Sequence, residues 1–267
     1  LFRSVTPVAG LTTNAGGTTE IGANVRTDTG NQLYNDAVSL VAAVTLTGTT
    51  GSGLTFNSTA DGSNNLTLDI AGATTFAGAV GSGVGTEIGS GTGTAITVNS
   101  AGTTSFQSTL ETLSGIVQAD TAGEVTFGDD VTLAAGDTNS LFNADVTLDG
   151  LVMTSNGSLT FGNNPLTDTV TTTFNDVFLN TVNLPVLFDS AGDLNTAHLH
   201  VNTDTGVGNI TFNGTVDGGQ DLSLTAGSGT IGCNGGVGGT NPVGSGKGGA
   251  RSVRSGTGGV SFADAGA

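Results

Sequence analysis

Short stretches of alternating apolar and polar residues recur along the whole chain. Clear cases are LTLDI at 66–70, ITVNS at 96–100, DVTL at 130–133 and again at 145–148, and HLHV at 198–201. A period of two residues is typical of a β-strand with one buried face. Gly, Asn and Asp, which favour turns, separate these stretches, and no segment of helical length carries an apolar stripe. The pattern therefore predicts an all-β protein.

A fifteen-residue segment returns 156 positions later. LTFNSTADGSNNLTL at 54–68 reappears as ITFNGTVDGGQDLSL at 210–224, with eight of the fifteen positions identical. Shorter copies, each ending in Phe, lie at intervals of about twenty to the mid-thirties, which is the length of one coil of a β-solenoid. The Phe residues that we predict to stack in the core are Phe56, Phe76, Phe106, Phe127, Phe161, Phe188, Phe212 and Phe262.

One coil of two or three short strands has no core of its own, so such coils must stack. Stacking at about 4.8 Å pairs each strand with copies in the neighbouring coils and aligns like residues in columns. We therefore predict a parallel β-helix of about ten irregular coils. A two-sheet sandwich or jelly roll is the alternative, although it does not explain near-identical coils so far apart in the sequence.

Asn residues follow several strand ends. They either form amide ladders between coils or only tolerate the geometry of the turn. The candidates for laddering are Asn57, Asn99, Asn143, Asn175 and Asn213.

The composition changes after residue 225. We assign 1–225 to the solenoid coils, 226–259 to a Gly-rich arm or linker, and 260–267 to the start of a further strand or coil. The middle segment contains Lys247, Arg251 and Arg254, three of only five basic residues in the chain. We expect these three residues to contact the acidic body of a neighbouring subunit.

The charge balance is strongly acidic, with 22 Asp and Glu against five Lys and Arg and a formal net charge of −17. No basic face is available to displace counterions from phosphates, so we exclude nucleic acid as a partner. No apolar run approaches twenty residues, so we expect no membrane insertion of this segment. The acidic surface serves solubility or attracts divalent cations such as calcium diffusely, because the sequence contains no dedicated calcium loop.

Residues that could carry chemistry are few. His198 and His200, at positions i and i+2 of a strand, could supply two ligands of a metal site, with Asp193 and Asp204 flanking them. Asp129 and Asp130 form an acidic pair, but no Lys or Arg between 27 and 246 can neutralise a uronate substrate. Cys233 is alone, so it forms no internal disulfide. We predict no enzymatic activity and no bound cofactor.

The runs TDTGNQLYNDAVSL (27–40), TLTGT (45–49), LTFNSTADG (54–62) and ITFNGTVDG (210–218) resemble β-strand repeats of large secreted bacterial proteins. These belong to the filamentous-haemagglutinin-like and autotransporter-passenger group. The resemblance covers about 60 residues near the start and 30 later, and the segment 140–200 departs from it. It implies a right-handed parallel β-helix exported to the surface of a Gram-negative bacterium.

The most favoured function is an extracellular structural protein. In this hypothesis the chain builds a cell-surface filament, sheath or stalk by head-to-tail stacking of identical subunits, because an open sheet edge recruits further strands. The alternative is a monomeric adhesin passenger that binds host or environmental glycans. The chain begins at Leu1 without a signal peptide, so we expect it to be a portion of a longer product.

Overall fold

The computed structural model describes residues 7–83, 85–134, 139–163, 169–239, 241–244 and 251–262. Every paired strand among them is parallel to its neighbours, and no helix occurs in these ranges. The chain forms two compact units, unit 1 (Leu1–Thr138) and unit 2 (Asn139–Ala267), which together hold about ten turns of a parallel β-helix. The predicted fold class is therefore confirmed, while the right-handed winding stays a prediction.

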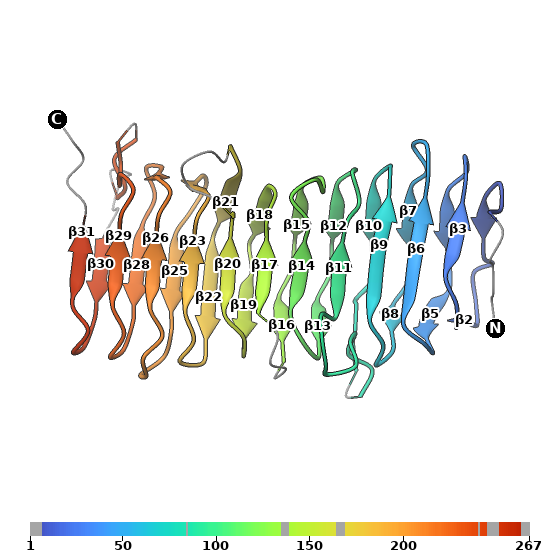
Figure 1. The fold of residues 1–267 in the computed structure, drawn as a ribbon, viewed down its shortest axis with the longest axis horizontal. Coiled ribbons are helices and arrows are strands. Elements are labelled where there is room, and N and C mark those ends of the chain that lie inside the picture. The colour runs from blue at the N-terminus through green and yellow to red at the C-terminus, as the bar shows by residue number, and fades with distance from the viewer. Residues whose placement is uncertain are drawn as a thin grey trace. The chain divides into compact units, whose positions relative to one another are not determined.

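Among its described residues, unit 1 contains sixteen short strands (Figure 1, blue to green). They are β1(Leu11–Thr12), β2(Thr18–Ile21), β3(Val25–Thr27), β4(Gln32–Tyr34), β5(Ala37–Leu40), β6(Val44–Gly48), β7(Leu54–Phe56), β8(Ala60–Asp61), β9(Leu66–Ile70), β10(Thr74–Phe76), β11(Ile96–Val98), β12(Thr104–Phe106), β13(Leu110–Thr112), β14(Ile116–Gln118), β15(Val125–Phe127) and β16(Val131–Leu133). Within this unit the strands stack in the orders β1-β4-β7-β10-β12-β15, β3-β6-β9-β11-β14, β2-β5-β8 and β13-β16. Val80 bridges Ala60 and Leu110, so a single residue takes the place of a strand in that turn.

Unit 2 repeats the arrangement (Figure 1, yellow-green to red). Its strands are β17(Ser140–Phe142), β18(Val146–Asp149), β19(Val152–Ser155), β20(Leu159–Phe161), β21(Thr171–Asn175), β22(Val177–Thr181), β23(Val186–Phe188), β24(Ala191–Leu194), β25(Leu199–Asn202), β26(Ile210–Phe212), β27(Val216–Asp217), β28(Leu222–Thr225), β29(Ile231–Cys233), β30(Arg251–Arg254) and β31(Val260–Phe262). They stack in the orders β17-β20-β23-β26-β29-β31, β18-β21-β24-β27 and β19-β22-β25-β28-β30. Two of these strands, β29 and β30, lie inside the Gly-rich segment 226–259, and β31 begins at residue 260.

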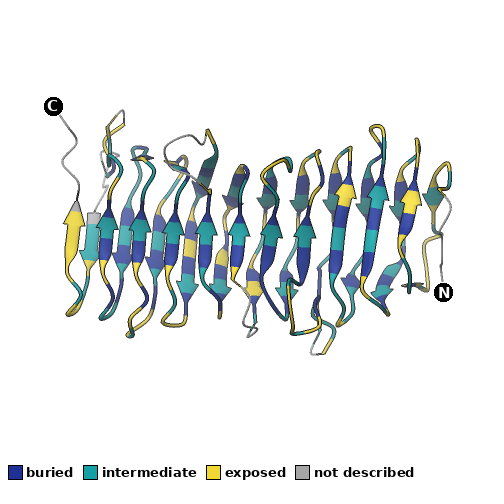
Figure 2. Ribbon diagram, viewed as in Figure 1, coloured by how far each residue is buried: buried dark blue, intermediate teal, exposed yellow. Residues whose placement is uncertain are grey.

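The alternation seen in the sequence determines which side chains are buried. Most three-residue strands show a buried, half-buried, buried order, so the first and third side chains point inward. Figure 2 shows the resulting alternation along most strands. Burial of these apolar side chains is the main stabilising contribution, at roughly 25 cal/mol per Å² removed from water.

The aromatic residues form a stack of rings in each unit. In unit 1 the rings of Tyr34, Phe56, Phe76, Phe106 and Phe127 lie 4.7–5.3 Å apart and within 10° of parallel. In unit 2 the rings of Phe142, Phe161, Phe188 and Phe212 lie 4.4–5.2 Å apart. These distances match the strand spacing, because each aromatic residue is the third residue of its strand and is paired in register with the next.

Phe174 contacts the second stack from its side, edge-on to Phe188 at 5.6 Å. Phe262, the last residue predicted to join the aromatic stack, lies on β31 and pairs in register with Cys233 on β29. Cys233 in turn pairs in register with Phe212. A buried thiol therefore occupies an aromatic position within unit 2.

Asn residues join neighbouring turns at two kinds of place. Directly after the aromatic position, Asn57 donates to Asn35 at 2.8 Å in unit 1. In unit 2, Asn234 donates to Asn213 at 2.7 Å, and Asn213 donates to Asp189 at 2.6 Å. Side-chain oxygens at other corners accept a backbone N–H from the next turn. These pairs are Asn24–Thr45, Asn31–Gly53, Asn65–Ser90, Asn209–Thr230 and Asp145–Thr171.

Laddering therefore occurs for three of the five Asn candidates, because Asn195 also donates to Asn175 at 3.1 Å. Asn143 differs, since its Oδ1 is buried and has no hydrogen-bond partner among the described residues. Asn99 donates its backbone N–H to the carbonyl of Leu68 at 2.8 Å, and it lines a surface depression together with Thr47 and Asp69.

Glycine is required where one turn crosses closely over the next. A Cβ on Gly102 would lie 2.1 Å from the carbonyl oxygen of Gly72, and a Cβ on Gly229 would lie 2.2 Å from that of Gly208. Both contacts are with backbone, which cannot move aside at low cost. The high glycine content is thus partly a consequence of stacking the corners.

Candidate functional site

An exposed cluster of aromatic and titratable side chains lies on the outer face of β22 and β25. Phe178 and His200 are in register on the two strands, with ring centroids 5.5 Å apart. His198 and His200 flank the buried Leu199 in the sequence. The ring of His198 lies edge-on to that of Phe178, with centroids 5.9 Å apart. We call Asp176, Phe178, His198 and His200 the imidazole cluster.

One close polar contact and one pKa shift characterise this cluster. The Nε2 atom of His198 lies 2.9 Å from Oδ1 of Asp176, which occupies the turn before β22 with a φ of 59°. Partial burial lowers the pKa of His200, and the positive charge of nearby His198 lowers it further. His200 therefore stays neutral to a lower pH than a free imidazole, as a hydrogen-bonding group beside an aromatic ring.

The side chains of the imidazole cluster are not gathered as the ligands of a metal ion would be. Among the described residues, no group of three or more His, Cys, Asp or Glu side chains is arranged to hold a metal ion. The sequence suggested Asp193 and Asp204 as flanking ligands, but the carboxylate beside His198 is that of Asp176, from the previous turn. The cluster therefore offers a flat aromatic surface with polar groups at its edge.

Phe178 was not selected from the sequence, although a signal was present. In VFLNT at 177–181, Phe178 stands between two buried positions, where the alternation calls for a polar residue. Its exposed fraction is 38%, and the neighbouring Val152 on β19 is exposed to a similar extent, 39%. A large apolar residue at a strand position whose side chain points to solvent is the sequence signal for such a surface.

Asp129 and Asp130 are arranged as a turn. One oxygen of Asp129 accepts the backbone N–H of Asp130 at 2.8 Å, which caps the start of β16. The two carboxylates are therefore neighbours on one short corner.

The basic residues expected to mediate assembly are only partly described. Lys247 lies outside the described residues, and for Arg251 the structure gives only its backbone on β30, in register with Leu222. Arg254 is exposed on the same strand and in register with Thr225. One free cationic side chain is thus placed on the outer face of unit 2 among the residues described.

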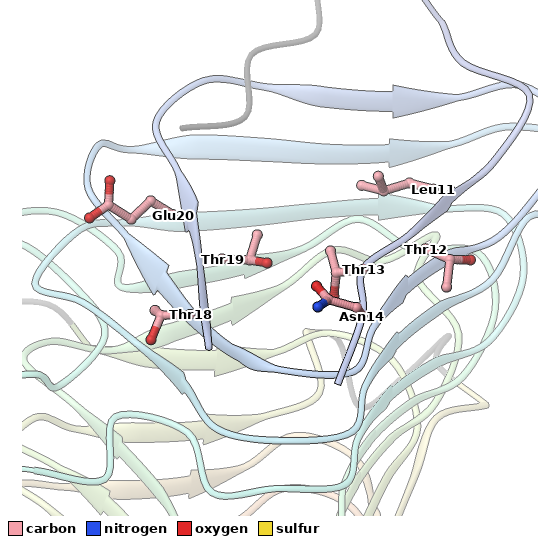
Figure 3. A pocket seen from close by; sticks show the side chains of 7 residues that line it. All are labelled: Leu11, Thr12, Thr13, Asn14, Thr18, Thr19 and Glu20. Atoms are coloured by element: carbon pink, nitrogen blue, oxygen red, sulfur yellow. The ribbon is translucent and has the colours of Figure 1, made fainter. Parts of the chain in front are cut away.

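An open depression of about 560 Å³ lies between β1 and β2 (Figure 3). It is lined by Leu11, Thr12, Thr13, Asn14, Thr18, Thr19 and Glu20. β1 pairs with β4 and β2 pairs with β5, and no other described strand pairs with either of them. The depression therefore lies at two sheet edges whose outer backbone groups face no described strand.

A buried carboxylate organises the turn beside this depression. The hydroxyl of Thr13 donates to Asp36 at 2.5 Å, and that of Thr19 donates to both carboxylate oxygens at 2.9 Å. These bonds, that from Thr13 first, lower the pKa of Asp36 although burial opposes the shift. The next inward residues are also polar, since Tyr34 donates to Gln32, and Gln32 donates to the carbonyl of Thr47. The core of unit 1 is thus hydrogen-bonded and polar at this edge.

No protein-family model, curated protein or solved structure matches this chain. Among the residues described, none of the secondary structure is a helix of the length and apolar character needed to cross a membrane.

Proposed function

We propose that this chain is an extracellular structural protein, a β-solenoid that builds a filament, sheath or stalk on a bacterial cell surface. The observation that carries the proposal is the pair of edge strands β1 and β2, whose outer edges face no other described strand. An incoming parallel strand could continue the same hydrogen-bonding pattern there. The sequence resemblance to filamentous-haemagglutinin-like and autotransporter-passenger repeats supports the same placement.

The geometry of β1 indicates how such stacking would work. Leu11 and Thr13 donate their backbone N–H groups toward the neighbouring strand β4, to the carbonyls of Asn31 and Leu33 respectively. In a parallel strand the backbone groups of alternate residues point in opposite directions, so those of Thr12 point to the open edge. Head-to-tail addition of a second copy would use these groups and would not close, which produces a fibre.

The decisive experiment blocks the open edge without disturbing the pairing below it. Thr12→Pro removes the outward N–H, and Thr12→Val retains it with a side chain of similar shape. We expect electron micrographs to show filaments for the unchanged chain and for T12V, and short or no filaments for T12P. Filaments of unchanged length in T12P would contradict strand stacking at this edge.

A second experiment tests the contact with the acidic body. Reversing the charge of Lys247, Arg251 and Arg254 to Glu, or raising the salt concentration, should shorten the filaments, because attraction to the acidic neighbour is lost or screened. Unchanged filament length in both conditions would remove these residues from the assembly contact.

A second candidate function is favoured by the imidazole cluster: an adhesin that binds glycans as a monomer. Phe178 presents an aromatic ring to solvent, with His198, His200 and Asp176 at its edge and Asn180 two residues further along the strand. Such a surface can stack on a sugar ring and hydrogen-bond its hydroxyls. Discrete particles that lose glycan binding in Phe178→Ala but not in Val152→Ala would favour this function. Equal binding by both variants would exclude Phe178 as the contact.

A further inference from the structure

The chain contains three Asn-Gly pairs, all in the described part of unit 2. They are Asn156-Gly157, Asn213-Gly214 and Asn234-Gly235. An Asn before Gly is susceptible to deamidation, because Gly has no side chain to keep its backbone nitrogen away from the Asn side chain. The three pairs share this local sequence, so any difference between them must come from the structure.

Deamidation requires that neither the Asn side-chain amide nor the Gly backbone N–H is held by other contacts. The backbone nitrogen of Gly bonds to Cγ of Asn, the Cγ–Nδ2 bond breaks, and ammonia leaves with the proton of the Gly amide. Water then opens the cyclic imide at one of its two carbonyls, which gives Asp or isoaspartate. The Asn side chain must therefore rotate toward its own backbone, and the Gly N–H must be able to lose its proton.

Both atoms are held in place at Asn213 and Asn234. Asn213 donates to Asp189 and accepts from Asn234, so the two amides belong to one ladder. The N–H groups of Gly214 and Gly235 donate to the carbonyls of Phe188 and Phe212, each at 3.3 Å and each in the preceding turn. Formation of the imide at either position would have to break contacts between two turns.

The corner at Asn156 has neither restraint. Asn156 is exposed, and its side chain has no hydrogen-bond partner among the described residues. The N–H of Gly157 donates to Oγ of Ser155 at 3.1 Å, a residue of the same corner, and that hydroxyl donates to the carbonyl of Gly157 at 2.9 Å. The imide can therefore form without separating one turn from the next.

We propose that Asn156 is the deamidation site of this protein, and that the Asn ladder protects Asn213 and Asn234. This inference is independent of the proposed function. Isoaspartate would insert one extra carbon into the backbone between β19 and β20, immediately before Leu159 enters the core. Asp or isoaspartate would also add a negative charge to a chain that already carries −17.

Peptide mapping by mass spectrometry during incubation of the folded protein measures the three rates separately. Asn234 is the matched comparison, because it is as exposed as Asn156 but belongs to the ladder. We expect Asn156 to react on the order of tenfold faster than Asn234, since one or two hydrogen bonds must break at Asn234 first. In denaturant the three rates should become similar. A folded-state rate at Asn234 equal to or above that at Asn156 would overturn the proposal.

A variant of the ladder itself makes the test specific. Asn213→Ala removes the acceptor of the Asn234 amide and should raise the rate at Asn234 severalfold, while the rate at Asn156 stays unchanged. Asn195→Ala breaks a different ladder, with Asn175, and should change neither rate. An unchanged rate at Asn234 in N213A would show that the ladder does not protect it. In N213A, a rise at both remaining sites, Asn156 and Asn234, would attribute the effect to unfolding and would equally contradict the proposal.

Discussion

The two units use the same sequence motif at different steps of the winding. In unit 1 the aromatic strand begins a series of three positions, as in β7, β8 and β9, and the next aromatic strand is β10. In unit 2 the corresponding series is β26, β27 and β28, followed by β29 with Cys233. Between the aromatic strands β15 and β17, however, only β16 lies among the described strands. The aromatic position thus shifts from one strand of the three-strand turn in unit 1 to another in unit 2, whereas the strand order itself is continuous.

The spacing of the aromatic residues contains the same shift. Phe127 and Phe142 are fifteen residues apart, whereas neighbouring members of either stack are 19 to 30 residues apart. Fifteen residues are about two strands of a three-strand turn. The comparison teaches that the motif specifies a local unit, namely an inward aromatic residue followed by a corner, and does not specify which strand of the turn carries it.

Removing one ring from the middle of each stack should have the largest effect. Phe76 and Phe188 both have stacked rings on two sides, and Phe188 also meets Phe174 edge-on. We expect Phe76→Ala and Phe188→Ala each to lower the free energy of unfolding by about 3–5 kcal/mol, with F188A at the upper end. Denaturant titrations followed by circular dichroism measure both. A loss below about 1 kcal/mol in either variant would contradict the role of its stack.

The ladders allow a finer comparison of the two units. Asn213 has two ladder bonds in unit 2, whereas Asn57 has one, to Asn35, in unit 1. At about 0.5–1.5 kcal/mol per net hydrogen bond, Asn213→Ala should cost roughly twice as much as Asn57→Ala. The same titrations decide this, and an equal cost would show that the second bond adds nothing.

The stability of unit 1 should depend on pH through Asp36. Its folded-state pKa is lowered, so its stabilising contribution is present above the pKa of the unfolded chain and is lost as the pH falls through the folded-state pKa. Asp36→Asn should remove this dependence and cost roughly 1 kcal/mol at neutral pH, because the hydroxyls of Thr13 and Thr19 lose their charged acceptor. Unfolding measured from neutral to acidic pH tests this. The same acid-dependent loss in D36N would assign it to other carboxylates.

Much of the fold could be predicted from the sequence, because the repeated unit is local. The alternation of apolar and polar residues shows which side chains of each strand point into the core. The Phe at the end of each copy of the repeated motif predicts a stack of rings. Tyr34 could not be predicted from a repeat defined by Phe, although QLY at 32–34 pairs in register with LTF at 54–56. Phe142 was missed because the expected interval ran from Phe127 to Phe161 and passed over it.

The contacts between turns were harder to predict because they depend on corner length. His198 pairs with Asp176 only because β22 and β25 align Val177 with Leu199. Adding or removing one residue in the intervening corners would shift the register by one position, and every side chain would then face the opposite side of the sheet from its present partner. The hydroxyls that bond Asp36 likewise come from the previous turn, 17 and 23 residues earlier in the chain.

The smallest expected change concerns Cys233, which also tests whether the two units open separately. Cys233 is 1% exposed at an aromatic position of unit 2, and burial raises its pKa to about 11. Cys233→Ala should therefore cost only about 1 kcal/mol, and a thiol reagent near neutral pH should react slowly with the folded protein and rapidly in denaturant. Because the turns of a solenoid contact only their neighbours, Phe188→Ala should speed labelling of Cys233 more than Phe76→Ala does. Equal acceleration by the two variants would mean that the thiol becomes exposed only when both units unfold together.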